Sequence, residues 1–194
     1  MANELTGRRI AILAASGVEQ VEYEQPRKAV EDAGAVATLV SLDTGEIQAM
    51  NADINKGDTL TVEAAIGDVS ADEFDALILP GGTCNPDTLR QNAAVISFVQ
   101  AIVEAGKPVG AICHAPWTLV EADLVRGRTL TSYPSLRTDI RNAGGTVVDQ
   151  EVVTDRGLVT SRTPDDLDAF CATIVEEFAE GAHSAHDAGA TAQA

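Results

Sequence analysis

A short apolar run that ends at a cysteine is the feature that most constrains this chain. Pro108–Ile112 has the composition of a buried strand, and residues 114–122 are predicted to continue as a helix, so that Cys113 falls at the join. Small residues, Ala111 and Ala115, flank it two positions away on either side. A sharp turn between strand and helix needs small residues at these positions, because strand and helix nearly touch there. The pattern predicts an exposed thiol above a sheet.

Such a thiol would lie where a helix begins, beside His114. Unpaired N–H groups and the helix dipole favour an anion at this place, and a protonated His114 would add to the effect. Both stabilise thiolate, which is the reactive form of cysteine. The alternative is that Cys113 is a small buried residue at the end of a strand, as many single cysteines are.

Strands and helices are predicted to alternate along most of the chain. This order predicts one α/β domain over residues 1–180, with an open, largely parallel sheet covered by helices on both faces. The strands are expected at 8–15, 35–42, 75–79, 108–112, 130–132, 147–154 and 158–161, and the helices begin near Pro26, Asn85, Val95, His114, Ser135 and Thr163. Residues 45–63 are expected to form a small hairpin.

Ligands of such sheets bind outside the carboxyl ends of the strands. Three polar or glycine-containing segments fall there: residues 16–22, residues 81–87, and Cys113 with His114. Their convergence favours a catalytic role for Cys113. The first loop lacks a Gly-x-Gly-x-x-Gly pattern, which removes the usual reason to expect a dinucleotide.

Charge and composition narrow the classes of partner. The chain has 13 Lys and Arg against 30 Asp and Glu, a formal net charge of −17, which disfavours nucleic acid and anionic membranes as partners. Neither an apolar segment of signal-peptide length nor one of membrane-span length is present, so a cytoplasmic protein is expected. The three cysteines have wide spacings that fit neither a disulfide framework nor a zinc site.

The last residues, 181–194, are rich in Ala, Gly, Ser and Thr, and we expect a disordered tail. It holds two of the three histidines, His183 and His186. Their spacing could place both on one helical face, but two glycines oppose a helix and no other ligand is near. No metal site is therefore predicted.

Several separated motifs, taken together, resemble a known family. Leu-Pro-Gly-Gly at 79–82, Ala-Ile-Cys-His-Ala-Pro at 111–116 and Val-Thr-Ser-Arg-Thr-Pro-Asp-Asp-Leu at 159–167 occur in the order typical of the PfpI intracellular-protease branch of the DJ-1/PfpI superfamily. The resemblance runs from about residue 8 to residue 180. It implies a flavodoxin-like three-layer sandwich, which this superfamily shares with class I glutamine amidotransferases.

The resemblance also implies roles for particular residues. Cys113 would be the nucleophile with His114 beside it, and Glu22, in an acidic motif that ends at Pro26, would be the carboxyl placed against the sulfur. A carboxylate against a thiol disfavours thiolate unless one proton is shared between them, so Glu22 would be partly protonated. The alternative for Glu22 is a solvated carboxylate on a loop.

An oxyanion site would be formed by the N–H groups of Gly81, Gly82 and His114, and Tyr133 would line the site. In peptidase-type members an acidic residue after the glycine pair reaches the histidine from a neighbouring subunit, and Asp87 occupies that position here.

This chain departs from the family pattern near the glycine pair. Asp87 is one methylene shorter than the Glu of many members, and the turn before it is one residue longer than in some. Ala115 stands where many members have Gly. Cys84, in the same turn, is either a resolving thiol for oxidised Cys113 or an incidental small residue.

The implied function is a cysteine-dependent enzyme in stress defence that needs no cofactor. Its partners would be small carbonyl compounds such as methylglyoxal, glycated proteins, or peptides, and it would self-associate as a dimer or a larger assembly. The alternative is a redox sensor or holdase that uses oxidation of Cys113 without turnover. Glutamine amidotransfer is disfavoured, because that class needs a distant histidine and none occurs between His114 and His183.

Overall fold

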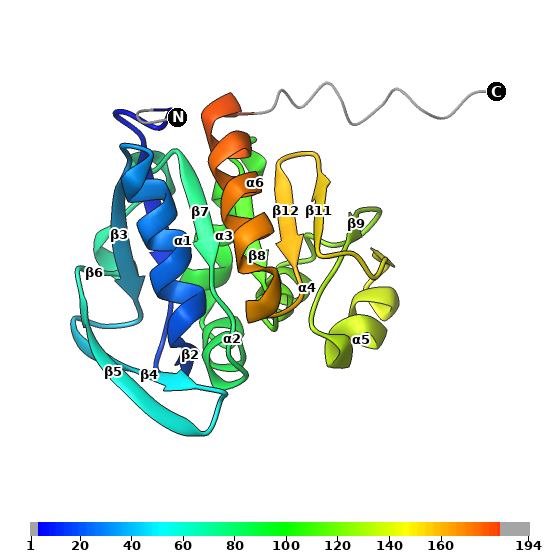
Figure 1. Cartoon of the computed structure of the whole chain (residues 1–194), viewed down its shortest axis with the longest axis horizontal. Coiled ribbons are helices and arrows are strands. Elements are labelled where there is room, and N and C mark those ends of the chain that lie inside the picture. The colour runs from blue at the N-terminus through cyan, green and yellow to red at the C-terminus, as the bar shows by residue number, and fades with distance from the viewer. Residues whose placement is uncertain (1–3, 183–194) are drawn as a thin grey trace.

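The computed structural model describes residues 4–182 and has a sheet covered by helices on both faces (Figure 1). Within these residues the large sheet has the strand order β11-β12-β8-β7-β1-β3-β6, and every neighbouring pair is parallel except β11 with β12. Its strands are β1 (Arg9–Leu13), β3 (Val36–Ser41), β6 (Ala64–Ala65), β7 (Ala76–Leu79), β8 (Val109–Ile112), β11 (Val152–Asp155) and β12 (Leu158–Ser161). The expected flavodoxin-like α/β fold is confirmed.

The two faces of the sheet carry two separate apolar layers. Helices α1 (Gln20–Asp32) and α6 (Leu167–Glu180) lie in front of the sheet in Figure 1, and α3 (Ala93–Glu104) lies behind it. Two other helices, α2 (Cys84–Arg90) and α4 (Pro116–Glu121), pack against each other, and α5 (Arg137–Asn142) contacts α4. Strand residues alternate between the layers, so that each strand of the sheet's centre is buried on both sides, as parallel sheets require.

Two small sheets flank the large one. The expected hairpin at 45–63 is confirmed as β4 (Gly45–Asn51) and β5 (Asn55–Val62), with β2 (Val18–Glu19) beside β4. The other small sheet pairs β9 (Thr129–Leu130) with β10 (Thr146–Val147). Short 3-10 turns occur at 66–68, 71–73, 134–136 and 164–166.

One expected strand is divided in two by the fold. Residues 147–154 were predicted as a single strand, but β10 pairs with β9, whereas β11 pairs with β12 in the large sheet. The segment changes partners between them, which local sequence does not reveal. The predicted hairpin of β11 and β12 is confirmed, and its turn residues, Arg156 and Gly157, both have positive φ, as tight hairpin turns favour.

The first helix begins earlier than predicted. The sequence indicated a helix from Pro26, whereas α1 begins at Gln20 and includes this proline in its interior. Proline has no N–H to donate to the carbonyl four residues before it, that of Glu22. The helix tolerates this loss, and as a result Glu22 lies on a helix instead of on a loop.

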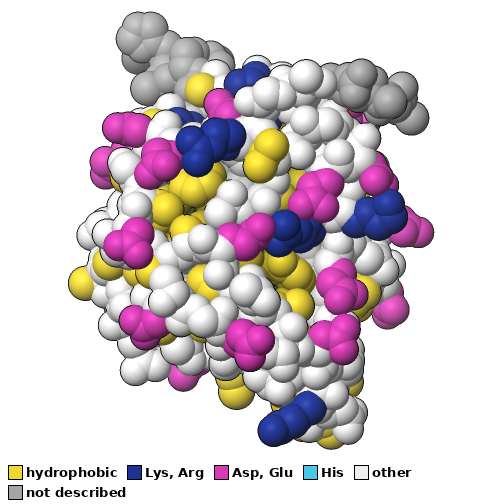
Figure 2. Space-filling view, turned by 90° about the vertical axis from the view of Figure 1, so that its left-hand side faces the viewer, with side chains coloured by type: hydrophobic (Ala, Val, Ile, Leu, Met, Phe, Trp, Pro, Cys, Tyr) yellow, Lys and Arg dark blue, Asp and Glu magenta, His cyan; other side chains and the backbone are white. Residues whose placement is uncertain are grey.

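Acidic side chains are scattered over the molecular surface. Figure 2 shows them spread across one whole face with few basic groups among them, which agrees with a net charge distributed over the chain. No described helix is long and apolar enough to cross a membrane. A disordered tail was expected over residues 181–194, and all but its first two residues, including His183 and His186, lie outside the described residues.

A glycine in β8 permits close packing of α6. A Cβ placed on Gly110 would lie 2.8 Å from Cγ2 of Ile174, with Phe170 at 3.2 Å. We expect Gly110→Ala to lower the free energy of unfolding in urea by about 1–3 kcal/mol, because the helix must shift. Gly67→Ala is the matched control, because an added Cβ there meets no atom within 4 Å, and it should leave stability nearly unchanged. Equal effects of the two substitutions would contradict this account of the packing.

Candidate active site

Cys113 lies at a strained turn directly after β8. Its φ is +63°, a left-handed conformation that costs a residue other than glycine about 1–3 kcal/mol. Backbone hydrogen bonds hold it there: its N–H donates to the Ser161 carbonyl at 3.1 Å, and its carbonyl accepts from the Tyr133 N–H at 2.9 Å. These two hydrogen bonds, with residues far along the chain, fix the conformation of the turn. The helix that follows begins at Pro116, two residues later than predicted, so it is not the source of the donors at the sulfur.

Glu22 projects from α1 to the same point and has no exposed surface. Its Oε2 accepts a hydrogen bond from the Gly81 N–H at 2.9 Å, and its Oε1 has no hydrogen-bond partner among the described residues. Burial raises the pKa of Glu22 to about 8, with smaller contributions from the negative charges of Glu19 and Asp53 and against the opposing hydrogen bonds to Cys113 and Gly81. The alternative of a solvated loop carboxylate is therefore wrong.

The Cys113 thiol shares this buried environment. Burial and the nearby Glu22 carboxylate raise its pKa, while the backbone N–H groups of Gly82 and His114 lower it by donating toward the sulfur. Two neighbouring acids in so dry a site cannot both be ionised, so the pair keeps a proton until well above the usual range of a carboxyl. One proton can then pass between carboxyl and sulfur.

The two glycines after β7 have different tasks. The Gly82 N–H faces the sulfur, whereas the Gly81 N–H is already bound to Glu22. A Cβ on Gly81 would lie 2.5 Å from Glu22 Oε2 and 2.7 Å from Cys113 Cβ, so only glycine fits between these side chains. The donors that remain for an oxyanion are those of Gly82 and His114, and the geometry assigns Gly81 to holding the carboxyl.

His114 is 5% exposed and is enclosed on several sides. Its Nδ1 lies 3.2 Å from Cys113 Sγ, and its Nε2 lies 3.2 Å from Ser135 Oγ. The Tyr133 ring stacks on it with 4.3 Å between the ring centroids. Burial lowers the pKa of His114, so the neutral imidazole is favoured over the cation expected from the sequence. Ser135 was missed, because nothing in the local sequence distinguishes it from another residue near a helix start.

Asp87 is exposed on α2 and does not meet His114 within the chain. Its backbone carbonyl accepts from Gln91 Nε2 at 2.8 Å, and its carboxylate is 3.5 Å from the same nitrogen. Both ring nitrogens of His114 already have partners, Cys113 and Ser135. Action of Asp87 across a subunit contact stays a prediction, and it would require a rearrangement at one of these nitrogens.

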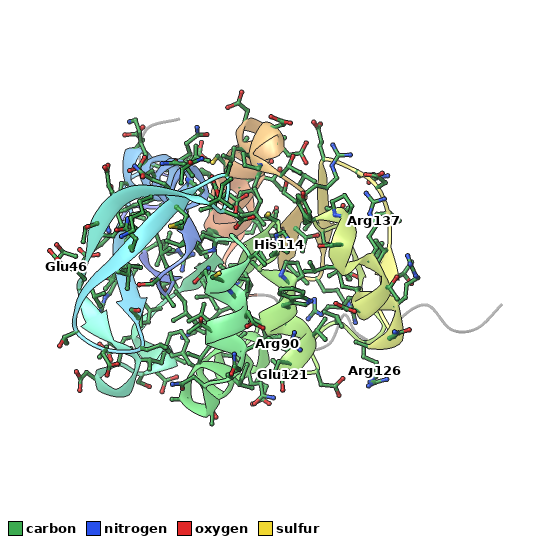
Figure 3. All side chains as sticks on the ribbon, turned by 90° about the horizontal axis from the view of Figure 1, so that it is seen from below. Glu46, Arg90, His114, Glu121, Arg126 and Arg137 are labelled. Carbon is green, nitrogen blue, oxygen red and sulfur yellow. The ribbon has the colours of Figure 1, made fainter. Side chains whose placement is uncertain are left out.

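A cleft of about 300 Å³ opens beside the sulfur. Figure 3 looks onto this edge of the sheet, with His114 near the centre of the molecule. The cleft is formed by the ends of several elements, and its lining residues are Glu19, Glu22, Ala52, Asp53, Gly82, Cys113, Tyr133 and Pro164. Tyr133 thus lines it, as the sequence predicted. Asp53 was missed, because it lies at the tip of the β4-β5 hairpin, far along the chain from the motifs.

The remaining cysteines lie apart from this arrangement. Cys84 is exposed at the start of α2, and Cys171 is half-buried in α6, where burial raises its pKa to about 12. A resolving role for Cys84 stays a prediction. Among the described residues no group of His, Cys, Asp and Glu side chains could hold a metal ion.

Comparisons with known proteins identify the family of the chain. Residues 8–177 match the model of the DJ-1/PfpI family. Two Bacillus subtilis (strain 168) proteins are similar to the chain: "Putative cysteine protease YraA" at 43% identity over 164 residues, and "General stress protein 18" at 42% over 165, each over 84% of this chain and 94% of the relative. The crystal structure of Drosophila melanogaster DJ-1beta is similar with a TM-score of 0.79 and 28% identity, over 92% of this chain and 91% of that one.

The raised pKa of Glu22 predicts a pH-dependent stability. The carboxyl titrates near 4.5 when unfolded and at about 8 when folded, so the folded protein binds more protons between these values. Stability from this group is full below about 4.5 and is lost as the pH rises toward 8, at up to ~1.4 kcal/mol per pH unit. We therefore expect Glu22→Gln to gain stability relative to wild type from pH 5 to pH 8 in urea unfolding.

Glu46→Gln, which removes an exposed carboxylate on β4, is the control and should keep a constant offset from wild type. Parallel curves for wild type and Glu22→Gln would contradict a raised pKa at Glu22.

Proposed function

Because the chain belongs to the DJ-1/PfpI family, we propose that it is a stress-protective enzyme that uses Cys113 as a nucleophile against electrophilic carbonyl compounds. The observation that carries the proposal is the buried Glu22 carboxyl beside the sulfur, with its pKa raised to about 8. Such a group can give and take a proton near neutral pH, which a solvated carboxylate does poorly. The name of one relative, a general stress protein, supports a role in stress.

Glutathione-independent conversion of methylglyoxal to lactate fits these residues. The Cys113 sulfur adds to the aldehyde carbon, and the carbonyl oxygen takes up the proton of the thiol–carboxyl pair, which gives a hemithioacetal. The N–H groups of Gly82 and His114 face the sulfur and would donate to the oxygen on which charge develops during this addition.

Glu22 then moves a proton between two adjacent carbons. As carboxylate it removes the proton from the former aldehyde carbon and delivers it to the neighbouring carbonyl carbon, while the hydroxyl proton of the hemithioacetal passes to the oxygen of that neighbour. The product is a lactoyl thioester on Cys113. Water hydrolyses the thioester, which releases lactate and restores the thiol. The overall change is addition of one water to methylglyoxal, and no redox partner is needed. On an amino group of a protein modified by methylglyoxal, the sulfur would displace the amine from the hemiaminal carbon. The amine leaves with the thiol proton, and the same hemithioacetal forms on Cys113.

Peptide hydrolysis is the other activity of this proposal. It needs a proton donor for the leaving amine, and His114 is the candidate, with Asp87 of another subunit as its support. Asp87 has no contact with His114 within the chain, and Ser135 occupies the Nε2 position. The geometry therefore favours carbonyl chemistry over peptide cleavage.

A redox role uses the same residues and is favoured by one observation, the unpartnered Oε1 of the buried Glu22. Two equivalents of peroxide would convert the Cys113 thiolate to a sulfinate and release two waters. A protonated Glu22 could donate to a sulfinate oxygen. In this alternative the protein senses oxidants or holds other proteins without turnover.

We expect wild type to convert methylglyoxal to lactate without glutathione. Cys113→Ala should abolish the reaction, because no nucleophile remains, and Glu22→Gln should lower kcat by about a hundredfold or more through loss of proton transfer. Cys84→Ser is the matched cysteine control and should keep full activity. Asp87→Ala should also stay active. Cleavage of a fluorogenic peptide that disappears in Asp87→Ala would instead support the peptidase activity.

Peroxide treatment followed by measurement of the intact protein mass distinguishes the enzyme proposal from the redox alternative. The enzyme proposal predicts carbonyl turnover by the reduced protein and its loss on oxidation. Stoichiometric addition of two oxygens at Cys113 in a protein without any carbonyl turnover would favour the sensor.

A further inference from the structure

The cleft beside Cys113 is acidic, and no basic side chain of the described residues lines it. Its acidic lining residues are Glu19, Glu22 and Asp53, of which Glu22 holds a proton near neutral pH and Glu19 and Asp53 supply the negative charge. Each of the ion pairs found within residues 4–182 joins other residues, so none of these three carboxyl groups is neutralised by a lysine or an arginine there. An anionic substrate would meet repulsion without any cation to pair with.

Two of the carboxylates are fixed by backbone donors. Glu19 is 9% exposed and accepts the N–H groups of Ala52 at 2.9 Å and Asp53 at 3.1 Å. These two hairpin residues both have positive φ, a costly conformation that the Glu19 carboxylate stabilises. Asp53 in turn accepts from the N–H and the hydroxyl of Thr83, at 2.7 and 3.0 Å. The hairpin tip is thus anchored with its carboxylate on the cleft.

The third carboxyl shows that the site is incomplete. Glu22 has no exposed surface and lines the cleft, and its Oε1 has no partner within the described chain. Buried polar atoms are normally paired, so this oxygen can bond a ligand group in the cleft in addition to the Cys113 thiol with which the carboxyl shares a proton.

Basic residues near the cleft form ion pairs with residues that do not line it. Arg162 precedes the cleft residue Pro164 by two positions, but its guanidinium binds Asp166 at 2.9 Å and Asp149 at 2.8 Å. Arg137 pairs with the other oxygen of Asp149 at 2.9 Å. Because these two arginines are paired with Asp149 and Asp166, they do not compensate the negative charge of the cleft.

An aromatic side chain also lines the cleft. Tyr133 is 37% exposed, lines the cleft, and is held by stacking on His114. Aromatic faces attract cations, and an aromatic ring beside carboxylates is the usual surrounding of a bound ammonium or guanidinium group. Asp53, with Glu19 behind it, and Tyr133 therefore form a set that fits a positive charge next to the nucleophile.

We propose that this cleft selects electrophilic carbonyl compounds that carry a cationic group, an ammonium or guanidinium bound at Asp53 and Tyr133, over anionic compounds of similar size. The inference names the substrate class of the site and rests on the proposed function. Its test must therefore measure the charge preference of the cleft even if the protein turns over no carbonyl compound.

Charged thiol reagents provide such a test. Three methanethiosulfonates, with a trimethylammonium-ethyl, a methyl or a sulfonato-ethyl group, each form a mixed disulfide with Cys113 and release methanesulfinate, whatever the enzyme does. In a Cys84→Ser, Cys171→Ser background only Cys113 reacts. We expect the ratio of cationic to anionic rates, divided by the same ratio for a small free thiol, to be about tenfold or more at low salt and to shrink at high salt.

Asp53→Asn should lower this ratio by about three- to tenfold, because it removes one charge from the cleft while its amide can still contact Thr83. Glu46→Gln is the matched control: it removes one carboxylate from the same hairpin, at the margin of the molecule in Figure 3, away from the cleft lining. Its ratio should stay near that of wild type. An equal effect of both substitutions, or a faster anionic reagent, would overturn the proposal.

Inhibition of methylglyoxal turnover gives the second measurement. Agmatine, a guanidinium compound, should raise the KM for methylglyoxal in wild type without changing kcat. The rise in KM should be several-fold smaller in Asp53→Asn. Glutarate should not inhibit either protein. Inhibition by glutarate equal to that by agmatine would overturn the inference. Absence of carbonyl turnover together with the expected reagent ratios would contradict the proposed function and still support the cationic preference of the cleft.

Discussion

The buried carboxyl of Glu22 is the interaction on which the rest of the site depends. A charged or even a polar group without water must be paired, and here the pairing joins α1, the turn after β7 and the turn after β8. The Gly81 N–H supplies one bond, and only glycine leaves room for it between Glu22 and Cys113. Carboxyl, glycine and thiol therefore form one unit, in which the position of each determines the other two.

Strained backbone conformations occur at the turns that carry the groups of this site. Cys113 has a left-handed backbone after β8, and Ala52 and Asp53 have the same at the hairpin tip. Both places are held by hydrogen bonds from elements distant in sequence. The turns thus hold the sulfur and the hairpin carboxylate in the lining of one cleft, which fixes the distance between nucleophile and charge before any substrate enters.

Charge gives the cleft its selectivity and also sets the state of its acids. Glu19 and Asp53 add to the burial of Glu22 in raising its pKa, so the same carboxylates that attract a cation keep a proton available beside the sulfur. The neutral state of buried His114, between Cys113 and Ser135, adds no opposing positive charge. The proposed proton transfer and the proposed charge preference therefore have one common cause, a group of carboxyls that no basic side chain among residues 4–182 neutralises.

Local sequence predicted most of the strands and helices, the turn at Cys113 and the glycine pair, because apolar periodicity, small residues and turn residues act over a few positions. Glu22 was found through the resemblance of its motif to a known family. Tertiary structure decided what these groups touch. The partner of Glu22 lies 59 residues away, the anchor of the hairpin tip 33 and 34, and Ser135 lies 21 residues from His114. Such contacts depend on which strands become neighbours, and a helix that began six residues early, with a proline inside it, moved Glu22 from an expected loop into the core. Local patterns cannot specify this, because the free energy that decides it comes from packing the whole sheet.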